Sequence, residues 1–171
     1  MSSGVLSLAR AVFRLQIPLS TQIYTSSRTE KPGSPSWVWL EQARVNRRVL
    51  HNLADSLSFH PEASFHVCFL SQQVAELSLK AARLSLDPRF HCRHHKLHPN
   101  AQHLEKHHFF PKGFLLEAIK PLDNYYIRTR YPNCYKNEVV PARAFNTSQA
   151  IDAIEKADKV YQQVKNFMKS F

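Results

Sequence analysis

The segment from Asn146 to Lys169 reads NTSQAIDAIEKADKVYQQVKNFMK, and its pattern decides the fold class. Apolar side chains recur in it every three or four residues, which places them on one face of an α-helix. These positions are Ala150, Ile154, Ala157, Tyr161, Val164 and Met168. Asn146 or Thr147 can cap the first turn, and Lys165 and Lys169 suit the negative end of the helix dipole. The sequence therefore predicts a final amphipathic helix.

Two long helices are predicted in the first half of the chain. Ser34 followed by Pro35 is typical of a helix start, and the apolar stripe behind it continues to about Leu57. A second helix is predicted from Glu62 to Leu86. Because that helix is apolar on two faces, we expect it to lie inside a bundle with a neighbour on each side.

The third helical region is predicted to be segmented. Asn100 is a candidate cap for its start, and Pro111 and Pro121 interrupt it before a last part that ends near Arg130. A basic, histidine-rich connection (87–99) precedes this region, and a long loop (131–146) follows it. No segment alternates with the period of a β-strand, so we expect an all-α bundle of about four helices over residues 34–171.

The first 33 residues form an extension to this domain. Arg10, Arg14 and Arg28 occur there together with many serines, and no acidic residue precedes Glu30. This composition is typical of a mitochondrial presequence, and a disordered tail is the alternative. No apolar run is long enough to span a membrane. A cytoplasmic protein is expected, with a mitochondrial location as the alternative.

Composition narrows the function classes. Only three glycines are present, which excludes glycine-rich phosphate-binding loops. The formal net charge of +10 favours anionic partners, although a solvated basic surface explains it equally well. Three widely spaced cysteines make a disulfide framework improbable and favour a reducing compartment.

Histidines are concentrated between His91 and His108, together with Cys92. His103 and His107 are four residues apart on an expected helix, a spacing that places two imidazoles on one face. The cluster has no CxxC or HExxH spacing and no obvious acidic partner. We therefore predict neither a metal site nor a cofactor, and solvated histidines are the simpler interpretation.

A basic and aromatic motif, Arg-Thr-Arg-Tyr-Pro, occupies residues 128–132, and Lys136 follows it. Between Lys80 and Lys136 there are eleven Lys or Arg residues and only four Asp or Glu residues. Arginines beside tyrosines can bind phosphates and stack on a base. Taken alone, the motif is weak, because such pairs are common on solvated surfaces.

The order of motifs resembles the HEPN family, the nucleotide-binding domain of higher eukaryotes and prokaryotes. The likeness rests on Trp-Leu-Glu-Gln-Ala-Arg (39–44), the segment from Cys68 to Ala81, and Arg-Tyr-Pro (130–132) before an amphipathic helix. It covers about residues 36–171 and is greatest to the C-terminal HEPN domain of sacsin. The resemblance implies an up-and-down bundle of four to five helices.

The resemblance implies two functional classes. HEPN ribonucleases carry an Arg-x(4–6)-His motif near the last helices, but no histidine follows His108 here, and Arg89-x4-His94 lies elsewhere. The expected protein is thus not an enzyme. The other class binds GTP or ATP and forms homodimers, in sacsin with a chaperone context. The residues expected at a phosphate are Lys80, Arg83, Arg128, Arg130 and Lys136. The alternative is a module that binds a protein partner, or less readily RNA, without nucleotide specificity.

Overall fold

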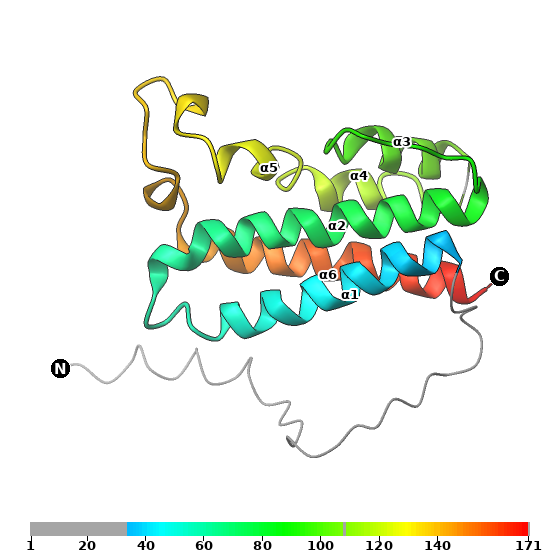
Figure 1. The fold of residues 1–171 in the computed structure, drawn as a ribbon, viewed down its shortest axis with the longest axis horizontal. Coiled ribbons are helices and arrows are strands. Elements are labelled where there is room, and N and C mark those ends of the chain that lie inside the picture. The colour runs from blue at the N-terminus through cyan, green and yellow to red at the C-terminus, as the bar shows by residue number, and fades with distance from the viewer. Residues whose placement is uncertain (1–33, 108, 171) are drawn as a thin grey trace, which may run out of the picture.

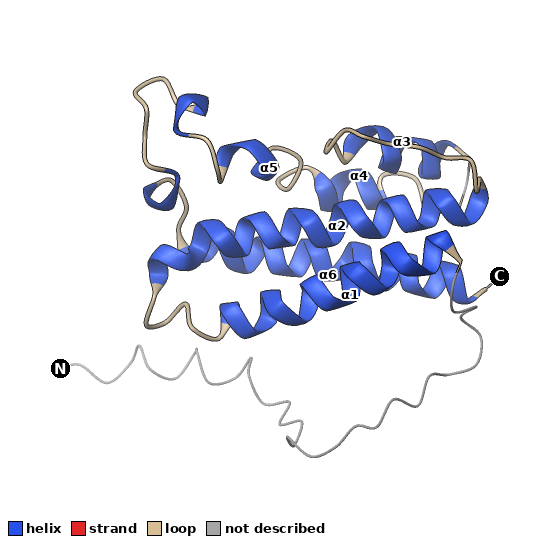
Figure 2. Ribbon diagram, in the orientation of Figure 1, coloured by secondary structure: helices blue, strands red, loops and turns tan. Residues whose placement is uncertain are grey.

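The computed structural model describes residues 34–107 and 109–170, and this part of the chain is helical without a β-strand (Figure 2). The predictions made for residues 1–33 lie outside the described residues. The helices have the following bounds: α1 Pro35–Ala54, α2 Ser64–Leu86, α3 His98–Lys106, α4 Phe114–Ile119, α5 Tyr125–Arg128 and α6 Thr147–Lys169. Three short 3-10 turns, η1 Pro61–Ala63, η2 Pro132–Cys134 and η3 Pro141–Arg143, complete the described elements. The all-α prediction is confirmed.

Helix α2 lies at the centre of the bundle (Figure 1). It packs against α1 and α6, and it also contacts α3 and α5. The apolar residues on both of its faces make this possible, as the sequence predicts. Helices α3, α4 and α5 follow one another back along α2, from its C-terminal end to its N-terminal end (Figure 1). Together they take the place of one segmented third helix.

Side-chain caps determine where the long helices begin. Ser34 precedes α1 and its Oγ accepts a hydrogen bond from the Trp37 amide. Asn146 precedes α6 and forms a reciprocal capping box with Gln149, in which each side chain accepts from the other residue's amide. These contacts satisfy amides that have no partner within the first turn. The predicted starts of both helices are confirmed.

The prediction that Asn100 caps the third helix is wrong. Helix α3 already begins at His98, and Asn100 lies buried within its first turn. The amides of Leu97 and His98 instead donate to Oδ1 of Asp123, which lies far along the chain. A carboxylate also serves the next helix, because Glu105 accepts from the amides of Gly113, Leu115 and Leu116. Distant acids, which the local sequence does not reveal, therefore position these short helices.

The core is continuous and draws on all of the longer helices. Cys68 is fully buried there, and burial, followed by the charge of Asp152, raises the pKa of its thiol to about 12. Its prediction as a small core residue is confirmed. Across the described ranges, no helix combines the length and the hydropathy needed to cross a bilayer.

Candidate functional site

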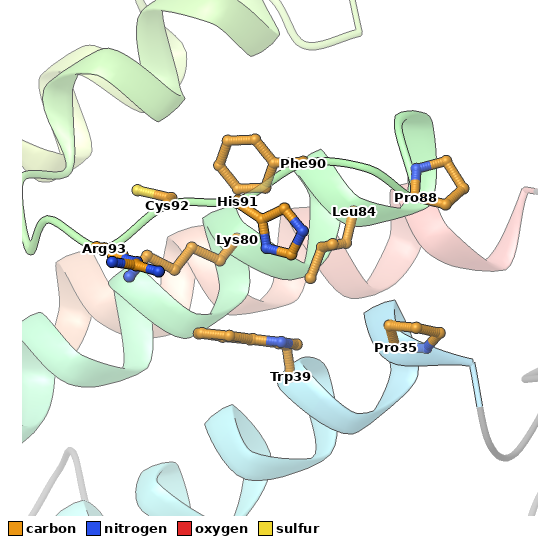
Figure 3. A pocket seen from close by; sticks show the side chains of 9 residues that line it. All are labelled: Pro35, Trp39, Lys80, Leu84, Pro88, Phe90, His91, Cys92 and Arg93. Atoms are coloured by element: carbon orange, nitrogen blue, oxygen red, sulfur yellow. The ribbon is translucent and has the colours of Figure 1, made fainter.

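A hollow of about 440 Å³ opens between the start of α1, the end of α2 and the extended segment after α2 (Figure 3). Nine residues line it: Pro35, Trp39, Lys80, Leu84, Pro88, Phe90, His91, Cys92 and Arg93. Trp39 comes from α1, Lys80 and Leu84 come from α2, and the segment 88–93 forms the opposite wall (Figure 3). The lining thus combines aromatic rings with cationic side chains. We call this feature the hollow.

Lys80 is a buried cation at this hollow, with 4% of its surface exposed. Its Nζ lies 2.7 Å from Oε1 of Glu76, one turn earlier on α2, and 5.3 Å from the centroid of the Trp39 ring. Glu76 is also buried and accepts from Nε2 of Gln72. A buried charge is tolerated only when it is paired and hydrogen-bonded, and here both conditions are met.

Arg83 lies just outside the lining of the hollow. Its guanidinium is 4.4 Å from the centroid of the Phe90 ring and therefore covers one wall. Burial lowers the pKa of Arg83, while the nearby Cys92 and Asp87 oppose this change. Lys80 and Arg83 are thus gathered at one end of α2, as two of the five residues expected at a phosphate.

Arg128 and Arg130 form a second basic cluster with exposed tyrosines. The Arg130 guanidinium lies 3.7 Å from the centroid of the Tyr126 ring, and its Nε donates to the Tyr126 carbonyl. Arg128 lies 5.2 Å from the Tyr135 ring, whose hydroxyl donates to the Arg128 carbonyl. Lys136, the next residue after Tyr135, is exposed. We call this feature the arginine cluster.

The two features are separate sites. Arg130 reaches α2 at Phe69, with its guanidinium 5.2 Å from that ring, whereas the hollow reaches α2 at Lys80. Eleven residues of helix separate positions 69 and 80, which corresponds to about 16 Å. The structure therefore does not bring all five predicted residues to one phosphate.

His95 connects the two sites through contacts with both. Its Nδ1 lies 3.1 Å from Oε1 of Glu76, the partner of Lys80. Its ring stacks on Tyr126, with centroids 3.7 Å apart and planes inclined by 12°. The conspicuous histidine-rich segment thus contributes a structural bridge.

The remaining histidines do not gather into a metal centre in the part of the chain that the structure describes. No three His, Cys, Asp or Glu side chains there lie close enough together to hold an ion. His103 and His107 do face one another, with ring centroids 4.4 Å apart. Burial lowers the pKa of His103, and the charges of Arg83, His107 and Lys106 lower it further.

Sequence reasoning missed several residues of the hollow. The sequence pattern predicts Trp39 as a core residue, and Phe90, His91 and Arg93 lie in the connection that suggested metal binding. Glu76 was missed entirely. The available signal was the mixture of aromatic and cationic residues in Pro-Arg-Phe-His-Cys-Arg (88–93). Its position opposite Trp39 depends on tertiary packing.

The comparisons with known proteins agree with this helical architecture. The model of the HEPN domain matches residues 37–167. The chain belongs to the HEPN family. A HEPN-like relative of known structure is TT1696 from Thermus thermophilus, whose crystal structure is 30% identical with a TM-score of 0.58. That comparison covers 78% of this chain and 98% of the Thermus chain. A search of curated protein sequences finds no significant match.

Within the HEPN fold, the residues with ribonuclease-like spacing lie on the surface. The Arg89 side chain is almost fully exposed, with its Nε 3.5 Å from Oδ1 of Asp87. The exposed His94 contacts the thiol of Cys92, with 3.4 Å between Nε2 and Sγ. Both residues belong to the connection after α2.

Proposed function

We propose that this HEPN chain is a non-catalytic nucleotide-binding module and that the nucleotide occupies the hollow. The observation that carries the proposal is the presence of the Trp39 ring and the Arg93 side chain in one cavity of about 440 Å³. Cavities of about 300–1,000 Å³ are typical of small-molecule sites. A base can stack on the indole, and a guanidinium is suited to a phosphate.

The manner of phosphate binding follows from the residues available. The chain has no glycine-rich loop, so side chains must hold the phosphate. Arg93 is exposed at the hollow, whereas Lys80 is buried beneath it. The resemblance to the sacsin domain supports a nucleotide as the ligand, with GTP and ATP as the first candidates.

Calorimetric titration of the full chain with GTP and ATP at about 150 mM salt tests this proposal, because that salt level screens weak surface attraction. We expect saturable binding that Arg93→Gln weakens about tenfold, equivalent to about 1.4 kcal/mol. Arg143→Gln removes an equal charge from the exposed η3 turn and should leave binding unchanged. Absence of heat at millimolar nucleotide would refute the proposal.

We propose that the module is not a ribonuclease. The support is that no histidine follows Arg128 or Arg130 in the sequence, so the acid or base of the family's motif is missing there. Incubation with single-stranded RNA should give no cleavage above background. Cleavage that disappears in Arg130→Ala or His94→Ala would contradict this assignment.

A second candidate function is favoured by the arginine cluster. The stacked Arg130 and the exposed Tyr131 present a cationic and aromatic surface that suits single-stranded RNA. RNA affinity should fall steeply with salt and decrease in the double variant Arg128→Gln/Arg130→Gln. Nucleotide binding at the hollow should be unaffected by that variant. An acidic protein partner on the same surface is the remaining alternative.

A homodimer is proposed from the family's behaviour. Val38 and Val49 are exposed on α1, and their spacing of eleven residues places them on one face. Such apolar positions are suited to an interface. Sedimentation equilibrium should give twice the chain mass, and Val38→Asp/Val49→Asp should give the monomer. A monomeric wild-type protein at micromolar concentration would exclude the dimer.

A chaperone-related role and the cellular compartment are also proposals, and both rest on the sequence. The role follows from the likeness to sacsin, and full-length protein should then slow the aggregation of a heat-unfolded enzyme. The compartment is cytoplasmic or mitochondrial, and import of a reporter fused to residues 1–35 distinguishes the two. A reporter that stays in the cytosol excludes the mitochondrial alternative.

A further inference from the structure

The cations at the hollow differ in whether their charge is already balanced. Lys80 and Glu76 form an ion pair in which each side chain is 4% exposed. Lys80 also faces the Trp39 ring, so the ammonium is satisfied by a carboxylate and an aromatic face. Lys80 therefore adds little net charge to a ligand in the hollow.

Arg93 and His91 supply the charge that remains open. Among the described residues, neither of these two lining residues forms an ion pair. His91 adds a charge only in its protonated form. Arg83 lies behind Phe90 and is electrostatically coupled to Asp87, so it contributes from outside the lining. The hollow thus presents about one full positive charge with a fractional addition.

This amount of charge matches one phosphate group. A phosphate monoester carries about −1.5 to −2 charges near neutral pH. A triphosphate adds further negative charge, and Glu76 at the base of the hollow repels it. An anion paired with too few cations pays a desolvation penalty that its contacts do not recover.

We propose that Glu76 is the specificity-determining residue of the hollow and that the ligand class is a nucleoside monophosphate. This inference rests on the nucleotide function proposed above and refines the ligand expected from the sequence. By neutralising Lys80, Glu76 reduces the field acting on the phosphates. Without the carboxylate, Lys80 would carry a free charge toward the same space and favour longer phosphate chains.

Parallel titrations of the full-length protein with AMP and ATP test the inference. In the wild type, AMP should bind at least as tightly as ATP. Glu76→Gln should shift the ratio of the two affinities toward ATP by about tenfold, because one positive charge is released at short range. Glu105→Gln removes another buried carboxylate outside the hollow and should leave the ratio unchanged. Circular dichroism should confirm that both variants are folded.

The outcomes separate this inference from the function on which it rests. Absence of binding by both nucleotides overturns the nucleotide function and the inference together. Tighter binding of ATP than of AMP by the wild type overturns the monophosphate assignment alone, and this readout requires no variant. An affinity ratio that stays within about twofold in a folded Glu76→Gln protein overturns the role of Glu76.

Discussion

Nε of Arg47 donates to Oδ1 of Asp158 over 2.8 Å and thereby ties α1 to α6. A second guanidinium nitrogen donates to Oδ2 over 3.0 Å, so the contact is bidentate. His51, one turn after Arg47, also contacts the carboxylate, with 3.1 Å between Nε2 and Oδ2. Bidentate pairs of this kind are among the stronger charged contacts in proteins. The pair therefore helps to fix how the first and last helices pack.

Stability should depend on pH through this carboxylate. Burial alone would raise the pKa of Asp158, but hydrogen bonds from His51 and Arg47 outweigh burial and hold it below the ordinary 3.8. A lowered folded-state pKa gives a stabilisation that is present above the unfolded value and lost as the pH falls through the folded value. Asp158→Asn should therefore reduce the free energy of unfolding by about 1–2 kcal/mol near neutral pH.

Urea unfolding at several pH values measures this effect. The difference between wild type and Asp158→Asn should stay constant from neutral pH down to about pH 5 and shrink below about pH 4. Asp152→Asn, on the exposed side of the same helix, is the matched control and should change stability little. A difference that grows on acidification would contradict the account.

The cap of α6 gives a second prediction. Asn146→Ala removes the side chain that accepts from the Gln149 amide, so it should cost about 1 kcal/mol of stability. The midpoint of urea denaturation should fall accordingly. Ser148→Ala changes an exposed residue in the same turn and should have a smaller effect. Equal midpoints for both variants would argue against the cap.

The long helices were predictable because their determinants are local. The stripe from Ala150 to Val164 and the cap at Asn146 lie within one continuous segment, and the structure confirms both. The start of α3 was not predictable, because Asp123 accepts from the Leu97 amide across 26 positions of sequence. Local propensity at Asn100 pointed to a cap that this distant carboxylate made unnecessary.

The candidate site was only partly predictable. Positive charge between Lys80 and Lys136 is evident in the sequence, but its division between two locations depends on how the chain returns along α2. The neutralising role of Glu76 was equally hidden. An acid and a lysine four residues apart usually form a solvated pair on a helix surface, whereas here tertiary packing buries both.

The three cysteines provide a third prediction with its controls in the same chain. Cys92 lines the hollow, Cys134 is exposed elsewhere, and Cys68 is buried with its pKa raised to about 12. Because the thiolate is the reactive form, Cys68 should react with iodoacetamide only after unfolding. Saturating AMP should slow the labelling of Cys92 severalfold and leave Cys134 unchanged.

Mass spectrometry of peptides after timed labelling measures each cysteine separately. Equal protection of Cys92 and Cys134 would indicate a general effect of nucleotide on the protein. Absence of protection at Cys92, despite saturable nucleotide binding, would place the ligand outside the hollow.

The most direct test of the central claim uses the indole of the hollow itself. The chain has two tryptophans, so Trp37→Phe leaves Trp39 as the single fluorophore. Titration of this variant with AMP should change Trp39 fluorescence saturably, because the base stacks on the ring, and Arg93→Gln should shift the midpoint about tenfold higher. Unchanged Trp39 emission under conditions where calorimetry detects bound nucleotide would contradict the assignment of the hollow as the nucleotide site.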